Sequence, residues 1–161
     1  MRFLAVILLT LYLAKVDASS VQVKVTLSPT GSFVAKTGDV TGFATETKSI
    51  VSAKDVRVKV KGLQTGVALR DKHLLKRLDS EKFPEIILVK ASGRSGKGTG
   101  VIKIKGIEKP ISGTYKITNN ICEAVFPLKI SEFGIDDVSY MGVGVDDEVE
   151  ISVSIPLKKS P

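Results

Sequence analysis

Few residues of this chain have side chains that combine into acid–base, nucleophilic or metal chemistry. Its 161 residues include one histidine, His73, and one cysteine, Cys122. A zinc site takes several His or Cys ligands, and a nucleophilic cysteine needs a nearby base or cation. Cys122 stands in an apolar alternating run, so we expect a buried thiol. The acidic groups at 136–137 and 146–148 stand near glycines and are interpreted as solvated turns. The sequence therefore predicts no metal site, no cofactor and no enzyme.

The polar residues most indicative of a functional site are Arg70, Asp71 and His73. They lie in the one stretch whose apolar residues recur at helical spacing. Arg70 and His73 are three residues apart and would share one face of a helix. Two interpretations stay open. In the first, this face meets the polar head group of a ligand at the mouth of a barrel. In the second, Arg70 or Asp71 pairs with another side chain and anchors the helix.

The elements that must position these residues are mostly strands, because apolar and polar residues alternate along the rest of the chain. In 55–61 three valines point one way and three cations the other. We predict about eight strands and a helical excursion around residues 67–80, which ends before Pro84. The predicted strands are 21–27, 32–35, 40–44, 55–61, 86–89, 101–105, 110–118, 121–130 and 149–155, with a short hairpin between 32–35 and 40–44 and a tight turn at Asn119-Asn120.

Strands with one apolar face must bury that face and pair their edges, and closure into a barrel does both. We therefore predict an all-β fold, an eight-stranded antiparallel barrel with one short helix. The chain has no tryptophan, and Val, Ile, Leu, Gly and Ala dominate the inward positions. This composition favours an elongated apolar void in an interior the size of one small ligand. A sandwich with a filled core is the alternative.

The start of the chain has the pattern of a secretory signal peptide: Arg2, an apolar run over 3–14, and an A-x-A-like site before Ser19. We expect cleavage after residue 18, a single domain over 19–161, and a periplasmic or secreted protein. Cleavage removes two cations and one carboxylate and lowers the net charge from +7 to +6. A basic exported protein is suited to transient contact with an anionic membrane surface, unless the charge serves solubility alone.

The basic, glycine-rich stretch 93–100 is not a phosphate loop, because it lacks the G-x-x-x-x-G-K-[ST] spacing and leads into a predicted strand. The cations of 57–61 and 103–105 lack the interleaved aromatic residues on which nucleotide bases stack. We therefore predict no nucleic-acid partner.

Six pieces of the sequence occur in a familiar order: Thr65-Gly66, the run 69–74, Phe83-Pro84-Glu85, and the runs 106–110, 131–135 and 145–149. From residue 25 to the C-terminus the chain resembles the YceI-like family of bacterial periplasmic proteins. The resemblance implies a lipocalin-like, eight-stranded antiparallel barrel that holds a long isoprenoid chain for transport, storage or a quinone-related role. The chain departs from the family pattern at 28–32, where many members carry a His-Ser pair.

The predicted function is that of an exported lipid-binding protein, which holds a polyisoprenoid or isoprenoid-quinone-like chain in an apolar barrel interior. The alternative is a structural or stress-response interaction module with a filled core and no resident ligand. The expected partner is an isoprenoid or other long-chain lipid, and a homodimer is left open. Arg70, Asp71 and His73 serve the head group or anchor the helix. The expected apolar lining comprises Phe33, Phe43, Val56, Val58, Val60, Ile102, Ile104, Tyr115, Ile117, Phe126, Leu128, Phe133, Ile151 and Val153.

Overall fold

The structure is a computed structural model that describes residues 19–136, 138–140 and 142–160, so the predicted signal peptide lies outside the described residues. Strands dominate, with one α-helix and two short 3-10 turns. The elements are β1 (Ser20–Ser28), β2 (Ser32–Thr37), β3 (Val40–Thr41), β4 (Ala44–Thr47), β5 (Ile50–Lys59), η1 (Val60–Gly62), α1 (Ala68–Arg77), β6 (Glu85–Arg94), β7 (Lys97–Ile104), β8 (Ile107–Thr118), β9 (Ile121–Lys129), η2 (Ile130–Phe133), β10 (Ser139–Tyr140), β11 (Val143–Val145) and β12 (Glu148–Lys159).

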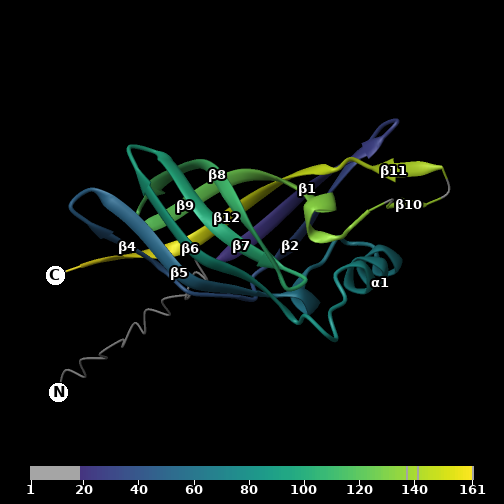
Figure 1. The fold of residues 1–161 in the computed structure, drawn as a ribbon, viewed down its shortest axis with the longest axis horizontal. Helices are drawn as coiled ribbons and strands as arrows, with labels where there is room; N and C mark the ends of the chain where they lie inside the picture. Colours follow the sequence, from purple (N-terminus) through teal and green to yellow (C-terminus); the bar gives the residue numbers. More distant parts are fainter. Residues whose placement is uncertain (1–18, 137, 141, 161) are drawn as a thin grey trace, which may run out of the picture.

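Seven strands form a closed ring in the order β12, β4, β5, β6, β7, β8 and β9, and β9 pairs with β12 again. The predicted barrel is therefore confirmed, although the ring has seven strands rather than eight and its β4–β12 pair is parallel. The parallel pair forms because β12 is long enough to reach β4 after it has passed β1. Its 12 residues pair with β1 over the first part and with β4 at the end. Figure 1 shows the ring as an elongated barrel.

The predicted hairpin between 32–35 and 40–44 is wrong, because β2 pairs with β1 whereas β3 pairs with β5. The glycines in this region bend the chain instead of reversing it. A Cβ at Gly42, whose φ is +123°, would lie 3.0 Å from the Cα of Val56. Glycine therefore lets this part of the wall pass close to β5. The turn at Asn119-Asn120 is confirmed, with positive φ at both residues.

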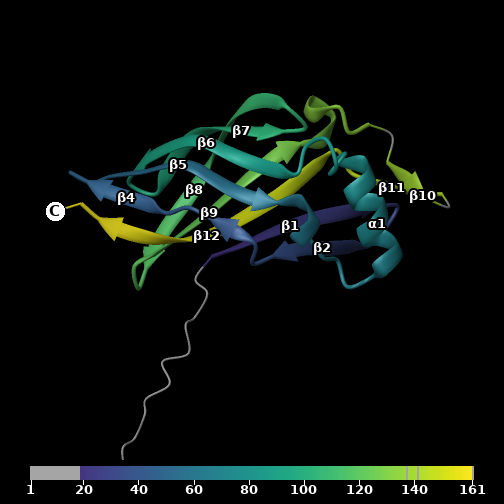
Figure 2. The same cartoon turned by 90° about the horizontal axis from the view of Figure 1, so that it is seen from below.

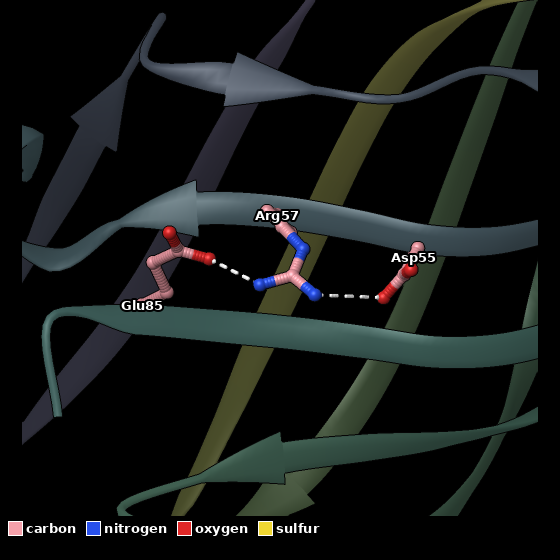
Figure 3. Close-up of polar contacts among 3 residues, drawn as sticks. All are labelled: Asp55, Arg57 and Glu85. Carbon is pink, nitrogen blue, oxygen red and sulfur yellow. Dashed lines mark hydrogen bonds and ion pairs between the residues drawn. The ribbon is translucent and has the colours of Figure 1, made fainter.

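Alternation decides which side chains fill the barrel, as the pattern of β5 indicates. Val56, Val58 and Val60 are buried, and the cations between them are exposed. On the outer surface, Arg57 bridges two carboxylates, Asp55 at 3.1 Å and Glu85 of β6 at 2.9 Å (Figure 3). The pKa of Arg57 is raised, mainly by its hydrogen bond to Glu85 and then by the charge of Asp55. This exposed network ties β5 to β6 outside the core.

The helix α1 covers one end of the barrel, which we call the helix end, and the turns at 47–50, 94–97 and 118–121 and residues 158–160 form the opposite hairpin end (Figures 1 and 2). Leu78 is buried in the core, and Leu74 and Leu75 pack against it. The helix predicted around 67–80 is confirmed, with bounds of Ala68–Arg77. An amphipathic stripe of leucines thus closes the helix end.

Candidate functional site: an apolar cavity in the barrel

The barrel contains an apolar cavity of about 90 Å³ in the half nearer the hairpin end. Its wall comes from the hairpin-end portions of β4 to β9 and β12. Most of its inward positions are aliphatic or glycine, and Tyr115 and Phe126 are its only aromatic residues among those described. The lining comprises Ala44, Val51, Ser52, Ala53, Leu88, Ala91, Ser92, Gly93, Gly98, Thr99, Ile111, Ser112, Gly113, Thr114, Tyr115, Cys122, Ala124, Val125, Phe126, Val153 and Ile155.

A row of glycines forms part of the cavity wall. Gly93 pairs with Gly98, and Gly98 pairs with Gly113, so three glycines lie side by side across β6, β7 and β8. The ring of Tyr115 lies against Gly93, where a Cβ would be 2.5 Å from Cε1 of the tyrosine. A Cβ at Gly113 would overlap the carbonyl oxygen of Val125. The wall therefore tolerates no larger residue at these two positions without moving its neighbours.

The other half of the barrel is filled, which differs from the elongated void that the composition favours. Nine predicted lining residues are at most 7% exposed and belong to the core outside or at the edge of the cavity. Of these nine, only Phe126 also lines it. The nine are Val56, Val58, Val60, Ile102, Ile104, Phe126, Leu128, Phe133 and Ile151. The branched side chains that were expected to leave a void pack against one another instead.

The remaining predicted lining residues fall in three places. Tyr115 and Val153 are half-buried and line the cavity together with Phe126. Phe33 is half-buried on β2, away from the cavity. The prediction that Phe43 and Ile117 line the interior is wrong, because they are 43% and 37% exposed and do not line the cavity. Alternation alone misassigned them, since Phe43 follows the bend at Gly42 and Ile117 lies next to the β8–β9 turn.

Sequence reasoning missed the small residues that define the cavity, such as Ala44, Ala53, Ala91 and Ala124. Their signal is present in the sequence as alanine or glycine at inward positions of neighbouring strands. Reading that signal requires the pairing of one strand with the next. A bulge between Leu88 and Lys90 also changes the phase of β6, so a simple count along the strand selects the wrong face.

The polar group Arg70, Asp71 and His73 belongs to α1. This helix covers the helix end (Figure 2), whereas the cavity lies in the half nearer the hairpin end. The guanidinium of Arg70 stacks over the ring of Phe33, 4.3 Å from its centroid. Asp71 accepts hydrogen bonds from the backbone N–H and the hydroxyl of Thr65. These bonds, the hydroxyl first, lower the pKa of Asp71. Arg70 thus joins the helix to β2, Asp71 fixes the loop that leads into the helix, and His73 is on the exposed side of the helix.

Cys122 is buried, at 7% exposure, and its thiol lies in the cavity wall. Burial raises the pKa of this thiol, and the neighbouring charge of Glu123 adds to the effect. The described residues include no cluster of three or more His, Cys, Asp or Glu side chains able to hold a metal ion. Within the same residues, no helix is long and apolar enough to cross a membrane. The chemistry that the cavity offers is therefore apolar contact.

Comparison with protein families shows which family this chain belongs to. A family model, the YceI-like domain, matches residues 12–157. The chain belongs to the YceI-like family. Comparison with curated proteins gives no match.

Several solved structures are similar to this YceI-like chain. BcnA from Burkholderia cenocepacia is 16% identical with a TM-score of 0.63, over 83% of this chain and 94% of that one. A polyisoprenoid binding domain from Saccharophagus degradans, implicated in plant cell wall breakdown, is 8% identical with a TM-score of 0.60, over 86% and 92%. The Campylobacter jejuni YCEI protein is 14% identical with a TM-score of 0.53, over 74% and 80%. At these identities the similarity establishes a shared fold.

The sequence pieces that resemble the YceI-like family meet at the helix end, away from the cavity. Phe83 packs against Gly106, where a Cβ would lie 2.9 Å from the ring. The ammonium of Lys105 donates to the carbonyl of Gly134 at 3.3 Å. The run 131–135 is also joined to the run 145–149 through Asp147. These pieces therefore hold one end of the barrel closed and leave the cavity lining to other residues.

Proposed function

We propose that the protein is a non-enzymatic carrier or store that holds an isoprenoid or isoprenoid-quinone-like chain in its barrel. The supporting observation is the apolar cavity, whose inward wall is mostly alanine, glycine and aliphatic residues, with Tyr115, Phe126 and Cys122. One structural relative is described as a polyisoprenoid binding domain. A cavity without convergent polar groups discriminates little between head groups, so the chain of the ligand supplies most of the affinity.

The hydrophobic effect is large enough for this role. Burial of one five-carbon isoprene unit is worth roughly 3–4 kcal/mol, at about 0.8 kcal/mol per methylene. Binding costs the ligand several kcal/mol of lost freedom, which a few such units offset. An apolar cavity of about 150 Å³ accommodates benzene, so 90 Å³ accepts only a few carbons as it stands. A longer chain must therefore displace side chains beyond the cavity, and Phe126 at its border is the first candidate.

The filled half of the barrel favours a second candidate, an interaction module with no resident ligand. Native mass spectrometry separates the two. The protein is expressed from its full-length sequence, purified from the cell envelope and kept intact. A bound species of isoprenoid mass supports the carrier, and a bare protein mass under gentle conditions supports the module. The mass also gives the N-terminus, and a start at Ser19 would support the proposed export to the periplasm.

A substitution in the cavity wall gives an independent test. Ala124 lines the cavity, so Ala124→Leu fills part of it without adding a polar group. Thr26→Leu makes a similar addition on the exposed face of β1 and serves as the control. We expect Ala124→Leu to reduce the bound lipid at an unchanged unfolding midpoint, and Thr26→Leu to leave the lipid unchanged. Equal lipid in both variants would count against the cavity as the binding site.

A further inference from the structure

The hairpin end gathers cations that belong to separate parts of the sequence. The β4–β5 turn carries Lys48, and the β6–β7 turn is bounded by Arg94 and Lys97. The parallel pairing of β12 with β4 brings Lys158 and Lys159 to the same end. Figure 1 shows these turns and the C-terminus together, opposite α1. Five positive charges therefore surround one end of the barrel.

These five cations are not neutralised by their surroundings. All are exposed, and within the described part of the chain none of them forms an ion pair. Two acidic side chains lie near this end among the described residues: Glu123, which pairs with Lys116 at 3.1 Å, and Glu46, which is half-buried. A group of like charges without counter-ions attracts an anionic surface over about a Debye length.

Apolar side chains accompany the cations at this end. Ile50, the first residue after the β4–β5 turn, is 38% exposed, and Ile117 beside the β8–β9 turn is 37% exposed. Phe43 lies under the ammonium of Lys158, which is 4.0 Å from the ring centroid. Apolar and aromatic groups among cations are the composition that enters the interface of a bilayer.

The cavity lies close to this end. A surface hollow of about 690 Å³ is lined by Ile50, Arg94 and Lys97. The hollow and the apolar cavity share seven lining residues: Ser92, Gly93, Gly98, Thr99, Ser112, Gly113 and Thr114. The hollow and the cavity therefore adjoin the same part of the wall. The helix end is filled instead, because Leu63, Leu78 and Phe133 are buried there, so the hairpin end is the end of the barrel nearer the cavity.

We propose that the hairpin end docks on an anionic lipid bilayer and presents the cavity to it. This inference rests on the proposed function for its purpose, but it depends on surface charges that can be tested separately. Each cation close to an anionic bilayer strengthens binding by roughly fivefold. Ile50 and Phe43 add a contribution that salt does not screen.

The test is sedimentation with vesicles of phosphatidylcholine, alone or mixed with phosphatidylglycerol, with no isoprenoid in either. We expect binding to the anionic vesicles only, decreasing as salt is added. The triple variant Arg94→Gln/Lys97→Gln/Lys159→Gln should bind at least about tenfold more weakly. The matched control is Lys59→Gln/Lys72→Gln/Lys76→Gln, which removes three exposed cations at the helix end. The control should bind as the wild type does.

Two outcomes would overturn the proposal. One is the absence of binding to anionic vesicles at low salt, which would assign the cations to another partner such as an acidic protein. The other is an equal or greater loss in the helix-end control, which would show that only net charge or the helix matters.

Ile50→Ser should leave residual binding at high salt weaker than in the wild type. If native mass spectrometry finds no co-purifying lipid and the protein still docks, the carrier proposal fails and the docking surface stands.

Discussion

Both carboxylate oxygens of Asp147 accept hydrogen bonds from one residue, Ser131. The backbone N–H of Ser131 lies 2.8 Å from Oδ1, and its hydroxyl lies 2.7 Å from Oδ2. The backbone carbonyl of Asp147 also accepts from the N–H of Ile130 at 2.9 Å. The loop after β9 is thereby fixed to the start of β12, directly beside the buried Phe133. The acidic group at 146–148, for which the sequence predicts a solvated turn, therefore includes a residue that holds the fold together.

Asp147 should make the stability of the protein depend on acid. The two bonds from Ser131, the hydroxyl first, lower the pKa of Asp147 below its ordinary value of about 3.9. A lowered folded-state pKa stabilises the protein above the ordinary pKa, and this stabilisation is lost as the pH falls through the folded-state value. We expect Asp147→Asn to lower the urea midpoint at about pH 7 and to differ less from the wild type at about pH 3. A difference that does not depend on pH would contradict this assignment.

Thr65 and Asp71 should behave as a coupled pair. The carboxylate of Asp71 accepts hydrogen bonds from the backbone N–H and the hydroxyl of Thr65, just before α1 begins. In a double-mutant cycle with Thr65→Val and Asp71→Ala, the double variant should be only slightly less stable than Asp71→Ala alone. Thermal unfolding followed by circular dichroism gives all four midpoints. Additive effects of the two substitutions would show that the hydroxyl–carboxylate bond contributes nothing.

Phe133 should be important for stability and not for ligand content. It is 1% exposed and packs at the helix end, outside the cavity lining. Phe133→Ala should lower the free energy of unfolding by about 3–5 kcal/mol. Phe43→Ala, at a phenylalanine that is 43% exposed and contacts Lys158, is the control and should cost about 1 kcal/mol, well below the cost of Phe133→Ala. Lipid that disappears from Phe133→Ala while the variant remains folded would instead place Phe133 in the binding site.

The sequence was informative where local pattern determines structure. Alternation correctly placed Val56, Val58 and Val60 inside, and leucine spacing located α1. It was not informative where the answer depends on which strands are neighbours. The row of glycines in the cavity wall arises because Gly93, Gly98 and Gly113 pair across three strands, and no single strand contains that information. The distance between Arg70 and the cavity likewise follows from the barrel end at which α1 packs.

Cys122 offers a reporter for the state of the cavity. Its thiol lies in the cavity wall, and burial raises its pKa above the ordinary value, with a further contribution from Glu123. Thiolate is the reactive form, so at about pH 7 the thiol should react more slowly with a maleimide than free cysteine does. The rate should rise to the free-cysteine value in denaturant. A bound chain that covers the cavity wall should slow the reaction further.

The matched control for accessibility is Thr118→Cys in a Cys122→Ser background. Thr118 is exposed at the β8–β9 turn, so its replacement should react rapidly whether or not lipid is present. Labelling followed by intact mass spectrometry measures both rates in the protein as purified and after delipidation. Delipidation should accelerate the reaction of Cys122 and leave the control unchanged. If Cys122 in the folded, delipidated protein reacts as fast as the exposed cysteine, the thiol is not buried. If delipidation leaves its rate unchanged, bound lipid does not cover the cavity wall.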